Sequence, residues 1–111
     1  MNAEWVTGVA GQPERSISKH ELRMEPNRPN PFKQWTRIDY QLPAAGTVSL
    51  KVYNVAGQLV RTLAEGFQPA GAHAVRWDGR DDRGREVSSG VYLYRLTAGS
   101  GTATRKLTVV R

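Results

Sequence analysis

The sequence predicts an all-β fold, an immunoglobulin-like antiparallel β-sandwich of about seven short strands without a disulfide bond. Three observations predict it. Short segments in which apolar and polar residues alternate recur along the chain, as in half-buried strands. Turns rich in glycine and proline separate these segments at intervals of about 8–15 residues. No long helical period and no internal repeat is present, and the 111 residues, 39% of them hydrophobic, suit one small domain.

The chain begins with a polar stretch, 1–20, which has neither strand nor helical periodicity. We interpret it as a flexible linker that precedes the domain, 21–111. In the domain, Leu22 and Met24 share one face of a first short strand. The segment "RPNPF" follows, and because proline fixes its own φ and restricts the residue before it, this segment predicts a rigid corner between strands.

Six further strands are predicted after this corner, and most of them carry large apolar residues at alternate positions. The residues expected to face the core are Ile38, Tyr40 and Leu42, then Val48, Leu50 and Val52, then Val75 and Trp77, and finally Leu107 and Val109. The segment 59–66, "LVRTLAEG", also fits one helical turn, but its neighbours favour a strand. The strand "VYLYRLTA" has Tyr92 and Tyr94 on one face and aliphatic residues on the other.

Aromatic side chains must supply much of the core, because the chain has no cysteine. A buried aromatic side chain removes roughly 150–250 Å² from water, worth roughly 3–5 kcal/mol. We therefore expect Trp77 to be a central core residue whose replacement by alanine unfolds the domain.

Four separate motifs occur in one order along the chain. They are Asn30-Pro31-Phe32, Leu42-Pro43, Trp77-Asp78-Gly79 and Ser89-Gly90-Val91-Tyr92. With them, residues 21–111 resemble the C-terminal sorting domain of the bacterial type IX secretion system, a family that overlaps the flagellar hook-cap-type immunoglobulin-like domains. The segment 33–35, Lys-Gln-Trp, departs from the family pattern.

The resemblance implies a non-catalytic sorting signal. Such a domain directs the N-terminal cargo domain of its parent chain through the periplasm and the outer-membrane translocon to the cell surface. In many members a surface transpeptidase then removes the domain and attaches the cargo to anionic lipopolysaccharide. We expect the last strand to be recognised by the translocon, since a terminal strand at a sheet edge has free backbone groups. The residues assigned to this recognition are Arg105, Lys106, Leu107, Val109 and Arg111.

Three aspartates in one loop, Asp78, Asp81 and Asp82, are weak candidates for a calcium site, since calcium prefers 6–8 oxygen ligands. They alternate with arginines, and this weakens cation binding. The preferred interpretation is a structural turn in which Asp78 accepts amide hydrogen bonds while Gly79 and Gly84 supply special backbone angles. No cofactor is expected.

Catalysis is not expected either, because the histidines, His20 and His73, are isolated and no serine lies in a nucleophile elbow. The formal net charge of +6 is spread along the chain, which does not favour nucleic acid as a partner. No segment is apolar enough for a membrane span, and the first residues do not form a signal peptide.

Two alternatives remain open. Tyr92 and Tyr94, together with Trp35 and Trp5, could form an exposed aromatic stripe of a carbohydrate-binding accessory domain on a secreted hydrolase. A purely structural immunoglobulin-like spacer is the other alternative, because the fold alone does not decide the function.

Overall fold

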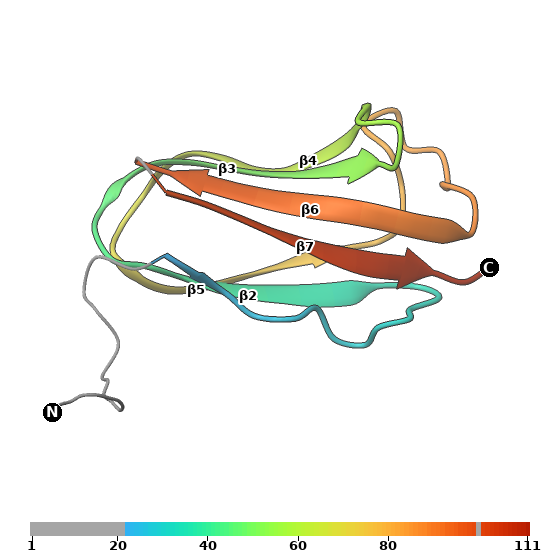
Figure 1. The fold of residues 1–111 in the computed structure, drawn as a ribbon, viewed down its shortest axis with the longest axis horizontal. Helices are drawn as coiled ribbons and strands as arrows, with labels where there is room; N and C mark the ends of the chain where they lie inside the picture. The colour runs from blue at the N-terminus through green and yellow to red at the C-terminus, as the bar shows by residue number, and fades with distance from the viewer. Residues whose placement is uncertain (1–21, 100) are drawn as a thin grey trace, which may run out of the picture.

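The structure, a computed structural model, describes residues 22–99 and 101–111. Its strands form two antiparallel sheets packed face to face (Figure 1), and the described residues contain no helix. The all-β sandwich of about seven strands is confirmed. The strands are β1 (Arg23–Met24), β2 (Thr36–Leu42), β3 (Gly46–Asn54), β4 (Leu59–Gln68), β5 (Gly71–Trp77), β6 (Gly90–Ala98) and β7 (Gly101–Val109). The linker prediction for 1–20 lies outside the described residues.

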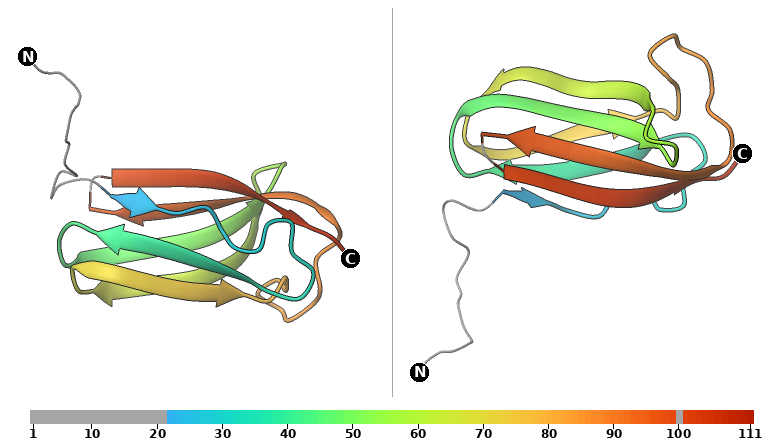
Figure 2. Two further views of the ribbon diagram at one scale, coloured as in Figure 1. Left: turned by 90° about the horizontal axis from the view of Figure 1, so that it is seen from below. Right: turned by 45° about the horizontal axis from the view of Figure 1, so that its top comes forward.

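The two sheets differ in size. The smaller sheet has the strand order β1-β2-β5 and the larger has the order β4-β3-β6-β7. Figure 2 shows the larger sheet lying over the smaller one. Strand β7 is therefore an edge strand, and it lies beside β1, the edge of the other sheet. The Arg105 side chain joins these two edges, because its Nε donates a hydrogen bond to the Met24 carbonyl over 2.7 Å.

The strand alternation predicted for β2, β3 and β7 is confirmed. Alternate residues of β2, of β3 and of the end of β7 (Leu107 and Val109) lie in the core, and the residues between them are more exposed, as the pleat of a strand requires. The large side chains that are completely or almost completely buried come from both sheets and from the corner before β2. They are Trp77, Tyr94, Phe32, Ile38, Leu42, Leu50, Leu96, Leu107, Val48, Val52 and Val109.

The ambiguous segment 59–66 is part of strand β4, as predicted. Its pairing with β3 shifts register twice, between Leu50 and Lys51 and between Val52 and Tyr53. At each shift β4 has one residue more than β3, so the alternation of inward and outward residues is interrupted there. For this reason Val60 and Leu63 both pack against the core, although their spacing resembles a helical turn.

Residues 22–99 and 101–111 contain no helix that is long and apolar enough to cross a membrane.

Candidate functional site

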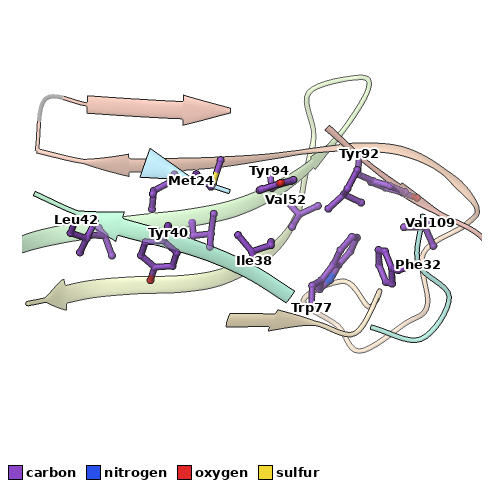
Figure 3. Close-up of a cluster of buried hydrophobic side chains, with 14 residues drawn as sticks. Met24, Phe32, Ile38, Tyr40, Leu42, Val52, Trp77, Tyr92, Tyr94 and Val109 are labelled. Carbon is purple, nitrogen blue, oxygen red and sulfur yellow. The ribbon is translucent and has the colours of Figure 1, made fainter. Parts of the chain in front are cut away.

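Three of the predicted motifs meet at one end of the sandwich, around the fully buried indole of Trp77 (Figure 3). The ring centre of Phe32 lies 5.5 Å from the ring centre of Trp77. The ring centre of Tyr92 lies 5.8 Å from that of Trp77. The Tyr92 hydroxyl donates to the Ser88 carbonyl over 2.8 Å, so its polar end is also satisfied. The motifs thus form one aromatic cluster, with Trp77 central as predicted.

The turn after β5 is built on the same tryptophan. Trp77 Nε1 donates to the Arg80 carbonyl over 2.8 Å, while the Arg80 amide donates to Asp78 Oδ1 over 3.1 Å. Gly79 and Gly84 have φ values of 74° and 82°, in the left-handed region that glycine adopts most easily. The predicted turn chemistry of Asp78, Gly79 and Gly84 is confirmed.

The three aspartates of this loop serve different parts of the chain. Asp78 and Asp82 both contact Arg61, and Asp82 Oδ1 also accepts the Thr62 amide over 3.0 Å. Within the loop, Asp81 Oδ1 accepts the amides of residues 83 and 85 over 2.9 and 3.0 Å. These amide hydrogen bonds, that of Arg85 foremost, lower the pKa of Asp81.

Because each carboxylate already has protein partners, the geometry favours the structural turn over a calcium site. No cluster of three or more possible metal ligands occurs in the described part of the chain.

The proline-rich corner lies along the end of β7. The Phe32 amide donates to the Thr108 carbonyl over 3.0 Å, and the Val110 amide donates to the Phe32 carbonyl over 2.9 Å. Asn30 Oδ1 accepts the Thr108 amide over 3.0 Å. The peptide bonds before both prolines of the corner are cis. The Asn30-Pro31-Phe32 motif therefore closes the last part of the β7 edge.

The rest of that edge is open. Since both backbone groups of Thr108 point away from β6, those of Thr104 and Lys106 point the same way, as the antiparallel ladder requires. Among the described residues, neither has a backbone partner on this outer side. The last strand is thus an edge strand, and among the described residues its part without a backbone partner spans about residues 102–106.

The residues assigned to translocon recognition occupy three different environments. Leu107 and Val109 are core residues, each with 1% of its surface exposed. Arg105 is exposed but is bonded to Met24, and Lys106 is exposed. In the folded domain, a partner could contact Lys106 directly but could not contact Leu107 or Val109.

The side chain of Arg111 is bonded within the domain. Its guanidinium donates to the carbonyls of Gly79 and Val87 (2.9 Å), in the connection between β5 and β6, and of Lys33 (3.3 Å), in the corner before β2. Its backbone amide donates to Ser89 Oγ over 2.8 Å. The residue therefore joins the loops at the Trp77 end of the sandwich.

The family model of the FlgD Ig-like domain matches residues 32–102. The match covers well over half of the chain, including β2 to β6 and the aromatic cluster. The chain belongs to the FlgD Ig-like domain family. The basal-body rod modification protein FlgD of Salmonella typhimurium is 36% identical to it over 64 residues, which are 58% of this chain and 27% of the relative. The match therefore spans about a quarter of the curated relative's length.

Solved structures share the fold at low sequence identity. PorU of Porphyromonas gingivalis, solved as a latent dimer, has a TM-score of 0.64 and 19% identity, over 95% of this chain and 10% of that one. PorZ of the same organism, described as an essential surface component of its type IX secretion system, has a TM-score of 0.53 and 20% identity, over 81% and 11%. At this identity the likeness shows the fold.

One buried polar cluster of this FlgD Ig-like domain was not predicted from the sequence. Asn27 and Thr36 are buried, and Asn27 Nδ2 donates to Thr36 Oγ1 over 3.0 Å, while Thr36 Oγ1 donates to the Pro29 carbonyl over 2.8 Å. The backbone amide of Asn27 donates to the Tyr94 hydroxyl over 2.9 Å. Burial raises the pKa of Tyr94, and the bond from Asn27 opposes the shift. The feature of the sequence that could have indicated this cluster is Asn27, a polar residue in the segment "PNRPNPF".

The alternative in which Tyr92 and Tyr94 form an exposed aromatic stripe is contradicted, and the expectation that the tyrosines contribute to the core is confirmed. Tyr92 is 8% exposed and Tyr94 is fully buried, because their strand face points into the sandwich. Trp35 is 40% exposed, and the Arg76 guanidinium lies 4.0 Å from the centre of its ring. Trp5 lies outside the described residues.

Proposed function

We propose that this domain is a non-catalytic sorting domain, which directs a parent protein through the type IX outer-membrane translocon to the cell surface. The observation that carries the proposal is the open edge of β7 at Thr104 and Lys106. An edge of this kind can pair with an extended segment of another protein, because its backbone groups are already aligned. The shared fold with PorZ, a surface component of such a system, supports the same assignment.

The partners follow from this proposal. The translocon would bind the domain in the periplasm, and the N-terminal cargo domain of the parent chain would precede it. At the surface, a transpeptidase would cut within 1–20 and attach the cargo to anionic lipopolysaccharide. The domain would be the substrate of this enzyme and not an enzyme itself.

A structural immunoglobulin-like domain is the second candidate. The family match and the FlgD relative, a basal-body rod modification protein, favour it. The carbohydrate-binding alternative has lost its main support, because Tyr92 and Tyr94 are buried. A structural domain would not carry a reporter to the cell surface, and this difference separates the two candidates.

The test is an export assay. Residues 1–111 are fused behind a signal peptide and a fluorescent reporter, in a bacterium with type IX machinery. We expect the reporter at the surface. We expect a Thr104→Pro variant to remain in the periplasm, because proline blocks the outer edge at a position that does not bond to β6. Thr104→Val is the control that keeps the amide.

Deleting residues 105–111 should also keep the reporter in the periplasm. This truncation removes Leu107 and Val109 from the core, however, so it changes folding as well as recognition. Thr104→Pro separates the two effects when its thermal denaturation is measured alongside. A wild-type reporter that stays in the periplasm would contradict the sorting function, and normal export of Thr104→Pro would contradict the role of the β7 edge.

A further inference from the structure

The outer face of the larger sheet carries basic side chains on three adjacent strands, Lys51 on β3, Arg95 on β6 and Lys106 on β7. The right-hand view of Figure 2 shows these strands side by side. Lys51 and Arg95 lie between buried neighbours, and Lys106 directly precedes the buried Leu107, so all three lie on the solvent side of the sheet. We call these three residues the basic face.

The basic face is distinguished by the clustering of its cations, since Arg23, Lys33, Arg76, Arg83 and Arg105 also form no ion pair within the described part of the chain. Elsewhere, many arginines have acidic partners within 4 Å. These pairs include Arg28 and Arg37 with Asp39, Arg61 with Asp78, Arg85 with Asp81 and Arg80 with Glu86. Within residues 22–99 and 101–111, no residue of the basic face forms such a pair. The nearest acidic residue on this face is Glu65, opposite Ser49 in the register, and no ion pair joins it to Lys51.

The register of the sheet places two of these cations together. Lys51 is directly opposite Arg95, and the outer neighbours in the same cross-strand row are Thr62 and Thr104. Like charges directly opposite one another destabilise a sheet. Threonine, which flanks the pair in this row, has a higher β-propensity than lysine. A function outside the domain would account for the arrangement.

Apolar side chains lie in the next row of the same face. The register aligns Leu59, Tyr53 and Leu93 across β4, β3 and β6, and the row ends at Lys106. Leu59 is 49% exposed, and Tyr53 and Leu93 are half-buried. The Arg95 guanidinium lies 5.3 Å from the centre of the Tyr53 ring. The face thus has an apolar row bordered by cations, which is the pattern of a protein interface.

We propose that the basic face is a docking surface for an acidic protein surface with an apolar centre, belonging to the export machinery. The inference rests on the proposed sorting function and adds a second contact to the β7 edge. The charges favour an acidic partner, and the aliphatic residues Leu59 and Leu93 favour a protein over a polysaccharide. One side of the Tyr53 ring is already covered by Arg95, so it is a poor platform for a nucleic-acid base.

The first experiment uses the export assay with matched variants. The face variant is Lys51→Thr with Arg95→Thr, and the control is Lys33→Thr with Arg83→Thr, which removes the same charge from exposed loops. We expect the face variant to melt at or above the wild-type temperature and to show about tenfold less reporter at the surface. Normal export of the face variant beside an exported wild type would overturn the docking surface and leave the sorting function intact. Equal loss in the control would overturn it too.

The second experiment does not depend on export. The purified domain and both variants are applied to immobilised poly-L-glutamate and eluted with salt. We expect the face variant to elute at lower salt than the control of equal net charge, because clustered cations bind a polyanion more strongly than scattered ones. Coincident elution would overturn the inference. Wild-type flotation with vesicles of phosphatidylglycerol and phosphatidylcholine, lost in the face variant, would instead assign the face to a membrane.

Discussion

The ring of Phe32 lies 5.5 Å from the ring of Trp77, with an angle of 59° between their planes. The two residues are 45 positions apart in the chain, from 32 to 77, and belong to different motifs. Phe32 is also hydrogen-bonded to Thr108 and Val110 through its backbone. The contact therefore connects the proline-rich corner, the turn after β5 and the end of β7.

Trp77→Ala should unfold the domain. Large-to-small changes of a buried aromatic residue cost about 3–5 kcal/mol, which approaches the whole stability of many small domains. Trp35→Ala, at a 40% exposed position, is the control and should change stability little. Thermal denaturation followed by circular dichroism measures both. A melting temperature of Trp77→Ala close to wild type would show that Trp77 is not the central core residue.

Thr36→Val should destabilise the domain by about 1–3 kcal/mol, because it removes the bonds of Thr36 Oγ1 to the Asn27 side-chain amide and the Pro29 carbonyl, which keep only their own 3.3 Å bond to each other. The shape of the side chain is nearly unchanged, so the loss reports the hydrogen bonds. Thr97→Val, at an exposed position of β6, is the matched control and should be within about 0.5 kcal/mol of wild type. Urea denaturation gives both values, and equal stability of the two variants would contradict the prediction.

Gly79→Ala should lower the free energy of unfolding more than Gly84→Ala. Both residues have a positive φ, so alanine is strained at each by about 1–2 kcal/mol. At position 79 the added Cβ would also lie 2.7 Å from Nη2 of Arg111, whereas position 84 faces open space. In an Arg111→Ala background, the two substitutions should therefore lower the free energy of unfolding, measured by urea denaturation, by the same amount. A difference that persists in that background would mean that Arg111 is not its cause.

Asp81 should make the stability depend on pH in the acidic range. Its pKa in the folded state lies below the ordinary value of 3.8, so the folded state holds its proton less tightly than the unfolded state. The stabilisation is present above the ordinary pKa and is lost as the pH falls through the lower folded value. Asp81→Asn keeps an oxygen acceptor but does not titrate, and it should flatten this part of the profile. Urea titrations between about pH 2 and 6 test it, with Glu65→Gln as the control for charge.

The strands and their inward faces could be predicted because alternation is local. Each residue of β2 or β3 has its face set by its neighbours along the strand, and Ile38 and Leu50 were placed correctly for this reason. The turn at Asp78 and Gly79 was also predictable, since its hydrogen bonds connect residues two or three apart. The sequence left two alternatives for Tyr92 and Tyr94, because both faces of β6 are apolar and alternation alone does not tell which face lies inside.

The sequence by itself determined the class of fold, the positions of the strands along the chain, most of the core and the turn chemistry. Tertiary structure alone decided what closes the β7 edge, where the Arg111 side chain binds and which cations lie opposite one another. These features depend on contacts between distant segments, such as Arg105 with Met24, 81 residues apart, and Asn27 with Tyr94, 67 apart. A local pattern carries no information on the sheet register that brings such residues together, since the register is set by the packing of the whole sandwich.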